Sequence, residues 1–214
     1  MRTGIVGGHG QIAIRLTRLL LERGDQVVSL VRNPDHAQEL SDLGAEGMVL
    51  DVEQADAGDL AAAVRGCDAV VFAAGAGPGS GPARKETMDY GGAVKLVEAA
   101  QAEDIGHYVM VSSRGANPQA AGGDFAVYLR AKGRADRDLE LSGVPYTIVR
   151  PGALTDEPGT GRVALADSVE GDAVTREDVA QVLAELLNVG PLNMTLELRQ
   201  GDVPVAEAVR RLAD

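Results

Sequence analysis

The chain has 214 residues, of which 45% are hydrophobic and 24% are charged, which is ordinary for a globular protein with one sizeable core. Acidic residues outnumber basic ones by 32 to 20, so the formal net charge is −12, and there is no Trp and only two Phe. Such a surface repels phosphate backbones and offers little aromatic area for base stacking, so we expect no nucleic-acid partner.

Targeting and metal signals are weak in this sequence. The N-terminus lacks the apolar core of a signal peptide, and no apolar run approaches the ~20 residues of a membrane span. Cys67 is the sole cysteine, so no internal disulfide can form, and we expect it to be a small buried residue. The three histidines, His9, His36 and His107, are scattered and predict no metal site. We therefore expect a cytoplasmic monomer or homodimer without membrane contact.

Short apolar runs alternate with longer amphipathic stretches along the chain. Helices are expected near 10–23, 55–65, 86–104, 125–142 and 175–188, with a last one from about 204. Strands are expected at Thr3–Val6, Gln26–Val31, Gly47–Leu50, Ala69–Ala73, Tyr108–Val111, Tyr146–Val149 and Leu196–Arg199. Several of these strands are apolar without alternation, as strands covered on both faces are. The order predicts an α/β fold, a Rossmann-like doubly wound parallel sheet with helices on both faces.

Three loops rich in Gly and Pro interrupt this pattern, at Gly75–Pro82, Gly115–Asp124 and Thr155–Gly161. Each follows the carboxyl end of an expected strand, the edge at which open α/β sheets bind ligands. All three are long for simple connections. We expect them to form the walls of a substrate site.

A glycine-rich turn, Gly7–Ala13, follows the first expected strand at once and opens an amphipathic helix. With the strand that begins at Gln26 it forms a βαβ unit of the ~30 residues typical of dinucleotide binding. Glycines permit the tight turn and let backbone amides approach a pyrophosphate, which the helix N-terminus attracts. His9 could meet a phosphate or only face solvent. The residues expected at the cofactor here are Gly7, Gly8, His9, Gly10, Gln11 and Ile12.

The ends of the second and third expected strands bear on the identity of the dinucleotide. An NAD site usually places an acidic residue after the second strand, to hold the ribose 2′-hydroxyl. This chain places Arg32 there, which can pair with a 2′-phosphate, although it could also be a solvated strand-end charge. Asp51 and Val52 end the third strand, where the carboxylate could accept from adenine or be a plain loop residue. We therefore expect NADP(H) in preference to NAD(H).

Tyr128 and Lys132 stand four residues apart, on one face of an expected helix. The lysine charge stabilises the anion that the phenol leaves on giving up a proton, and the lysine could also bind the nicotinamide ribose. The phenol could exchange a proton with a carbonyl or alcohol oxygen during hydride transfer. Ser112 and Ser113 close the preceding strand, where either hydroxyl could orient that oxygen. A surface pair without chemistry is the alternative.

These segments resemble the short-chain dehydrogenase/reductase superfamily over nearly the whole chain. More closely, they resemble its atypical branch of small NAD(P)H-binding proteins, the NmrA-like and biliverdin-reductase-B-like proteins, some of which carry the label NAD-dependent epimerase/dehydratase. The stretches that carry the resemblance are Gly7–Ala13, Leu30–Pro34, Gly66–Gly75, Val111–Ser113, Tyr128–Lys132, Ser142–Gly152, Leu154–Gly161 and Gly201–Ala208.

The resemblance implies further site residues. Asp89 stands where the superfamily's catalytic tetrad has Asn, and it could either hold water against Lys132 or form a salt bridge that weakens the lysine's role. Ala73, Ala74 and Gly75 match the segment beside the adenosine ribose. Pro151, Gly152, Ala153 and Leu154 match the segment that runs past the nicotinamide.

We therefore expect residues 1–214 to form one NAD(P)-binding Rossmann domain, with a cofactor-binding core at 1–150 and a small substrate region at 151–214. The leading functional hypothesis is an NADPH-dependent reductase of a small carbonyl, quinone or flavin-like acceptor. One alternative is a non-catalytic, NADP(H)-sensing regulatory protein, because members of this branch often lose tetrad residues. The other is a nucleotide-sugar epimerase or dehydratase, although these enzymes have a larger C-terminal lobe.

Overall fold

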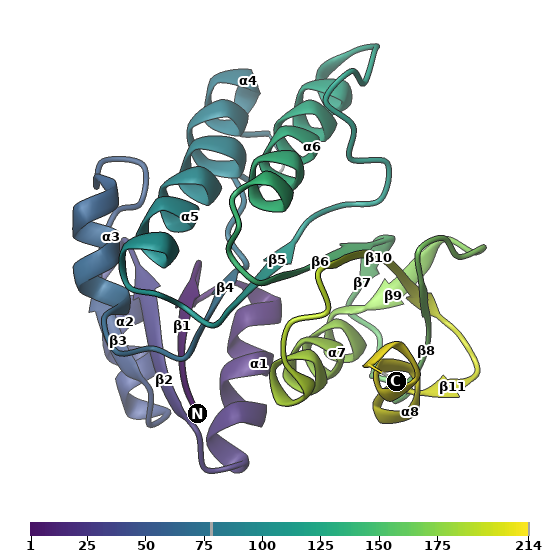
Figure 1. Ribbon diagram of the computed structural model, residues 1–214, viewed down its shortest axis with the longest axis horizontal. Coiled ribbons are helices and arrows are strands. Elements are labelled where there is room, and N and C mark those ends of the chain that lie inside the picture. Colours follow the sequence, from purple (N-terminus) through teal and green to yellow (C-terminus); the bar gives the residue numbers. More distant parts are fainter. Residues whose placement is uncertain (78, 214) are drawn as a thin grey trace.

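The computed structural model describes residues 1–77 and 79–213, apart from the side chain of residue 124. Residue 78, in the expected loop Gly75–Pro82, lies outside the described residues. Within them, nine strands form one sheet in the order β11-β8-β10-β6-β5-β4-β1-β2-β3 (Figure 1). These strands are β1 Arg2–Val6, β2 Gln26–Val31, β3 Glu46–Val49, β4 Ala69–Phe72, β5 His107–Val111, β6 Tyr146–Pro151, β8 Arg162–Ala166, β10 Met194–Gln200 and β11 Val203–Pro204.

The sheet is parallel from β3 to β10, and β8 and β11 add antiparallel pairs at the other edge. From β1 the chain adds strands on one side, through β2 to β3, and then on the other side, through β4 and β5 to β6. The loops that follow β1 and β4 therefore diverge, and a crevice is left at the carboxyl ends of these two strands. The fold class predicted from the sequence, a Rossmann-like doubly wound sheet, is confirmed.

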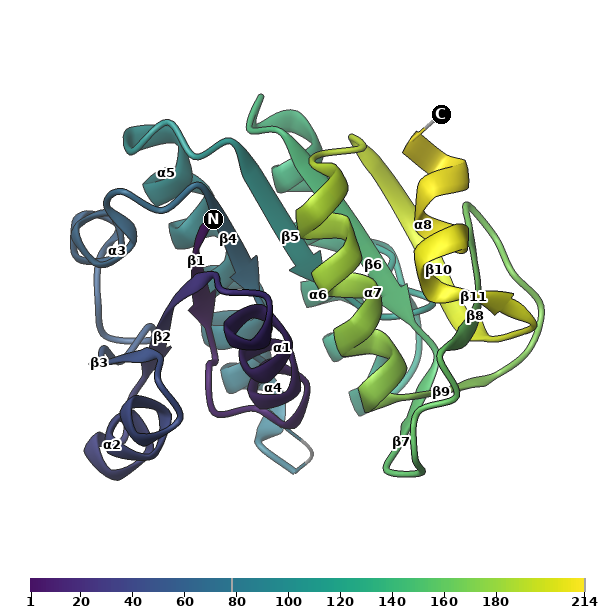
Figure 2. The ribbon, with the colours of Figure 1, turned by 90° about the horizontal axis from the view of Figure 1, so that it is seen from below.

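Helices cover both faces of the sheet. In Figure 2, α1, α7 and α8 lie in front of the sheet, while α5 and α6 lie behind it. Leu16 of α1 and Leu183 of α7 belong to the apolar cluster on the first face, and Leu96 of α5 and Leu139 of α6 belong to the cluster on the second. The helical segments are α1 Gln11–Glu22, α2 Pro34–Asp42, α3 Ala57–Val64, α4 Gly81–Arg84, the π-helix η1 Lys85–Gly92, α5 Ala93–Ala102, α6 Asp124–Leu141, α7 Arg176–Val189 and α8 Val205–Ala213.

Two helical segments differ from expectation. Helix α2 was missed because it buries only Ala37 and Leu40 and so carries little apolar periodicity. Its start is nevertheless encoded, since the Asn33 side chain accepts from the Asp35 amide and Pro34 occupies the first turn. The helix expected at 86–104 begins five residues earlier, at Gly81, and passes through the π-helix η1.

The C-terminal segment after β6 also contains unpredicted strands. Strands β8 and β11 extend the main sheet, while β7 (Ala153–Thr155) and β9 (Ala173–Thr175) form a separate parallel pair. They are two to five residues long and pair with distant segments, so local patterns give little sign of them. Helix α7 is capped by Thr175, whose hydroxyl accepts from the Asp178 amide. No helix in the described part of the chain is long and apolar enough to cross a membrane.

Candidate functional site

A groove of two joined cavities follows the carboxyl edge of the parallel strands. The smaller cavity, of about 310 Å³, lies over β1, β2 and β4, and the larger, of about 900 Å³, lies over β4, β5 and β6. Both are lined by Ala73, Ala74 and Gly75, which follow β4, so the two cavities meet there. The groove therefore lies at the reversal point of the sheet, as the strand order requires.

The glycine-rich turn lines the smaller cavity and leads into α1. Gly7 has a φ of +81°, and a Cβ there would lie 2.7 Å from the Cα of Ala74, so only glycine fits. A Cβ on Gly8 would lie 2.7 Å from the Ser29 side chain of β2. Gly10 is the N-cap of α1; no described side chain caps this helix, and its first turn carries no acid. The free amides of this helix end suit an anion such as a pyrophosphate.

Basic side chains gather where β2 ends. Arg32 is exposed and lines the smaller cavity together with His9, His36 and Arg84. His9 stacks on His36 with ring centroids 3.6 Å apart, and its Nε2 lies 2.8 Å from Oε2 of Glu39. His9 thus reaches from the turn to α2 and is not simply solvent-facing.

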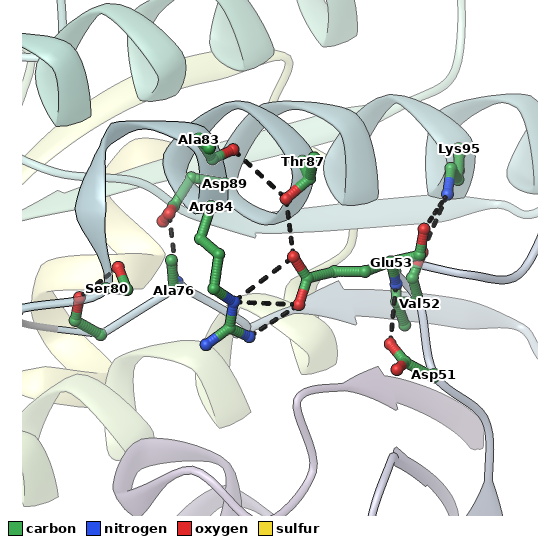
Figure 3. Close-up of polar contacts among 11 residues, drawn as sticks. Asp51, Val52, Glu53, Ala76, Ser80, Ala83, Arg84, Thr87, Asp89 and Lys95 are labelled. Atoms are coloured by element: carbon green, nitrogen blue, oxygen red, sulfur yellow. Dashed lines mark hydrogen bonds and ion pairs between the residues drawn. The ribbon is translucent and has the colours of Figure 1, made fainter.

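The loop after β3 forms the opposite wall of the smaller cavity. Asp51 and Val52 both line it, and an Asx turn from the Glu53 amide to Asp51 Oδ1, 3.0 Å, holds the loop (Figure 3). Glu53 accepts from Arg84 at 2.7 Å and from the Thr87 hydroxyl at 2.6 Å. These bonds, led by that of Arg84, hold the pKa of Glu53 below its usual value despite burial. Lys95 donates to the carbonyls of Val52, Glu53 and Ala55. The wall is therefore fixed to the α4–η1–α5 segment.

Tyr128 and Lys132 of α6 line the larger cavity together with Ile12 of the turn. Tyr128 is half-buried; its ring lies 5.7 Å from that of Phe125, and Lys85 Nζ lies 5.2 Å from its centroid. Lys132 is buried, and Nζ donates to the carbonyl oxygens of Val111 at 3.1 Å and Ala74 at 3.4 Å. The sequence separation of four therefore does bring phenol and ammonium to one cavity.

Asp89 of η1 faces Lys132. Its Oδ1 lies 3.6 Å from Lys132 Nζ, and its Oδ2 accepts from the Ala76 amide at 3.1 Å (Figure 3). Asp89 has no exposed surface, and Oδ1 has no hydrogen-bond partner among the described residues. The two side chains are therefore close enough to form a buried ion pair. The carboxylate ties the lysine to the loop after β4.

The two serines at the end of β5 have different surroundings, although both line the larger cavity. Ser112 is buried and donates to Oδ2 of Asp136 at 2.8 Å, an oxygen that also accepts from Arg150 at 2.9 Å. Burial raises the pKa of Asp136, while Arg150 and Ser112 oppose that rise. Ser113 is only half-buried and donates to the carbonyl of Arg114 at 3.3 Å, a long contact. Ser113 is the serine whose hydroxyl is freer to turn toward a ligand.

The segment Pro151–Leu154 forms the far wall of the larger cavity. The Gly152 amide donates to the Leu198 carbonyl and the Ala153 amide to that of Asp172. A Cβ on Gly152 would lie 1.9 Å from the Asp172 carbonyl oxygen, so the connection between β6 and β7 can approach Asp172, just before β9, because this residue is glycine. Five charged or aromatic residues that line this cavity were not predicted as site residues from the sequence: Lys85, Arg114, Phe125, Asp172 and Arg176. Of these, Arg114 directly follows the predicted Ser113.

Metal ligands do not converge in this groove. Throughout the described residues, no group of three or more His, Cys, Asp or Glu side chains is placed to hold a metal ion. The glycine turn, the uncapped start of α1 and the elongated groove instead fit a dinucleotide, with its pyrophosphate at the turn and its two nucleoside halves in the two cavities.

Comparison with known families agrees with this geometry. A family model described as NAD(P)H-binding matches residues 7–189. The chain belongs to this NAD(P)H-binding family. Within it, the chain is of the atypical short-chain dehydrogenase/reductase type that the sequence motifs predict.

Relatives of this NAD(P)H-binding protein span its whole length. The uncharacterised sugar epimerase YhfK of Bacillus subtilis is 37% identical and covers 99% of this chain and 100% of its own. A Bacillus halodurans structure, provisionally an NAD-dependent epimerase/dehydratase, is 36% identical, with a TM-score of 0.90 and 99% of both chains covered. ChuY, an anaerobillin reductase of Escherichia coli O157:H7, is 25% identical, with a TM-score of 0.80, and covers 95% of this chain and 98% of its own. The chain is an oxidoreductase-like nucleotide-binding protein.

Proposed function

We propose that this protein is an NADPH-dependent reductase of a small carbonyl, quinone or flavin-like acceptor. The observation that carries the proposal is the 900 Å³ cavity, which joins the cofactor groove and is lined by Ser113, Tyr128 and Lys132. A proton donor, a cation and an orienting hydroxyl around one space are what reduction of a C=O group requires.

A bound NADPH would supply the hydride, and the chain must supply the proton and hold the acceptor. We propose that the Tyr128 hydroxyl gives its proton to the acceptor oxygen and that Ser113 donates a hydrogen bond to the same oxygen. Lys132 would stabilise the negative charge left on the phenol. Ser112 would act indirectly, because its hydroxyl holds Asp136.

The proposed preference for NADPH rests on the end of β2. Arg32, His9 and His36 line the smaller cavity there. An extra phosphate on the adenosine ribose would gain charge-assisted hydrogen bonds from Arg32, which a 2′-hydroxyl would not gain to the same extent. We assign the remaining cofactor contacts to the glycine turn, to Asp51 and Val52, to Ala73–Gly75 and to Pro151–Leu154.

An NADP(H) sensor without turnover is the second candidate, and one contact favours it. Lys132 is already held by two carbonyl oxygens and by Asp89. A lysine held in this way has one N–H left to donate to a phenol or a ribose. A protein that only senses its cofactor would need no more from this lysine than its structural contacts.

An epimerase, the activity in the names of two relatives, is less well supported by this structure. Compared with a small acceptor, a nucleotide-sugar substrate is larger by a diphosphate and a sugar, which the protein would have to enclose beside the cofactor. Most of residues 151–214 form β8, β10, β11, α7 and α8, which complete the sheet and its helical layer. From this segment, the short β7–β9 pair, the loops beside it and the start of α7 are what is left to cover the site.

A screen of NADPH oxidation separates the reductase from the sensor. Quinones, flavins and aromatic aldehydes would be tested with saturating NADPH, and NADPH binding would be measured in parallel. We expect steady oxidation with at least one class. Tight NADPH binding without oxidation by any of them would favour the sensor.

A further inference from the structure

Two arginines converge on one carbonyl at the wall of the larger cavity. Arg114, which follows Ser113, donates from Nη1 to the Gly171 carbonyl oxygen at 2.7 Å. Arg199 of β10 donates from Nε to the same oxygen, also at 2.7 Å. Two like charges brought this close repel each other unless an anion compensates them. Arg114 and Arg199 therefore place two positive charges around one carbonyl oxygen in a chain whose net charge is −12.

Arg199 lies directly behind the cavity wall. It has no exposed surface, and its Nη2 has no hydrogen-bond partner among the described residues. Its Nη1 lies 2.8 Å from the position that a Cβ on Gly152 would take, and Gly152 lines the cavity. Burial lowers the pKa of Arg199, and the charge of Arg114 lowers it further.

The carboxylates near this pair compensate it only in part. Oε2 of Glu197 lies 3.6 Å from Nη2 of Arg199, and Oδ1 of Asp172 lies 3.7 Å from Nη1 of Arg114. The Asp172 side chain is 89% exposed, and exposed pairs at such distances contribute little. An anion from a ligand can therefore replace Asp172 beside Arg114 at small cost.

Arg114 is the member of this pair that a ligand can reach. Its side chain is 44% exposed, and it lines the larger cavity next to the proposed reaction site. The same cavity is lined by Phe125, 68% exposed, and Leu154, 38% exposed. Large apolar side chains exposed beside a cavity favour an apolar, flat ligand body. The cavity thus offers an apolar surface and, separately, a cation.

We propose that the acceptor of this reductase carries an anionic group, a carboxylate or a phosphate, that binds to Arg114 with Arg199 reinforcing the site from behind Gly152. The proposal rests on the proposed function, of which it defines the substrate class. It assigns to Arg114 a specificity role and leaves the proton chemistry at Tyr128.

Paired probes that differ only in charge test this by equilibrium binding, with NADP⁺ saturating and no turnover required. FMN and riboflavin share the isoalloxazine ring system and differ by one phosphate group. Binding of each is followed by flavin fluorescence. 4-Carboxybenzaldehyde and its methyl ester form the carboxylate pair, followed by calorimetry. We expect the anionic member of at least one pair to bind about tenfold more tightly. The pair that shows the difference identifies the anion as phosphate or carboxylate.

Arg114→Gln should remove this difference, and Arg114→Lys should restore part of it. Arg137→Gln, an exposed arginine of α6 outside the cavity lining, makes the same change in net charge and should leave the difference intact. Three results would overturn the proposal. They are equal affinities for the two members of both pairs, no binding of either anionic probe, and a difference in affinity that persists in Arg114→Gln. Turnover of neutral acceptors would continue in those cases, so failure of this proposal is distinguishable from failure of the proposed reductase.

Discussion

Asp89 and Lys132 form a buried ion pair, with Oδ1 and Nζ 3.6 Å apart, at the junction of the two cavities. Asp89 is fully buried and Lys132 is 3% exposed, so each charge depends on the other for compensation. The pair joins η1 to α6, and through the Ala76 amide it also holds the loop after β4. The residues that flank the cofactor groove are therefore coupled in charge as well as in space.

This coupling predicts non-additive stability effects. Lys132→Met leaves a buried carboxylate without its cation and should cost roughly 3 kcal/mol of unfolding free energy. Asp89→Asn should cost a similar amount for the opposite reason. The double variant removes both charges and should lose clearly less than the sum. Urea unfolding of the wild type, the two single variants and the double variant, all without cofactor, gives the coupling free energy between Asp89 and Lys132. Strictly additive losses would show that the two residues are not energetically linked.

Substitution of the two serines that follow β5 should give opposite phenotypes. Ser112→Ala removes a hydrogen bond to the buried Asp136 and should lower stability by about 1–2 kcal/mol. Ser113→Ala should leave stability nearly unchanged and lower kcat for carbonyl reduction, because the orienting hydroxyl is lost. Each variant serves as the control for the other, with unfolding and kinetics measured on both. A drop in kcat confined to Ser112→Ala would reverse the proposed roles.

Arg32→Ala should weaken NADPH binding by about 10- to 100-fold and NADH binding far less, since only NADPH carries the 2′-phosphate. Arg18→Ala, an exposed arginine on α1 outside the cavity lining, changes the net charge equally and should affect neither. The measurement is nicotinamide fluorescence during titration with each cofactor. Equal losses for NADPH and NADH would exclude the 2′-phosphate role of Arg32.

His107 predicts a specific loss of stability in acid. The residue is buried against the Thr147 hydroxyl, and burial lowers its pKa from 6.5 to about 4. Above pH 6.5 both folded and unfolded states are neutral, so the residue adds no pH dependence there. As the pH falls toward 4, the unfolded chain takes up a proton that the folded chain does not, and stability decreases.

Between pH 7 and pH 5 this effect amounts to about 2 kcal/mol. Urea unfolding of the wild type and of His107→Gln at both pH values isolates it from the carboxylates, which titrate in both proteins. The variant should lose less stability over this interval than the wild type. The same slope in both proteins would mean that His107 takes up its proton equally in the folded state.

Much of the fold could be predicted from the sequence because its signals are local. The unit β1–α1–β2 combines apolar strands, a glycine turn and an amphipathic helix, and each of its strand and helix ends falls within one residue of the predicted bound. The strands β4 and β5 are continuous apolar runs of the kind that only a doubly covered sheet buries. Helix α2 was not predicted because only two of its residues form the buried apolar face, so the sequence shows little helical periodicity there. Its only local signals are a capping residue and a proline in the first turn.

The site could be predicted less completely than the fold. Most residues named from the sequence line one groove, since parallel strands end at the same edge, whereas Gly8 and Gln11 line neither cavity. The sequence could not assign directions to the side chains: that Ser112 faces Asp136, or that His9 stacks on His36, depends on contacts 24 and 27 positions away in the chain. The convergence of Arg114 and Arg199 on Gly171 joins three segments and has no local signature.

If Tyr128 supplies the proton for reduction by bound NADPH, its hydroxyl is required for turnover but not for cofactor binding. NADPH oxidation with the best acceptor, and the Kd for NADPH, would be measured for the wild type, Tyr128→Phe and the control Tyr146→Phe, a position at the amino end of β6. We expect Tyr128→Phe to lower kcat by about 10²- to 10⁴-fold with an unchanged Kd, while Tyr146→Phe behaves as the wild type. Undiminished turnover in Tyr128→Phe would contradict this role of Tyr128.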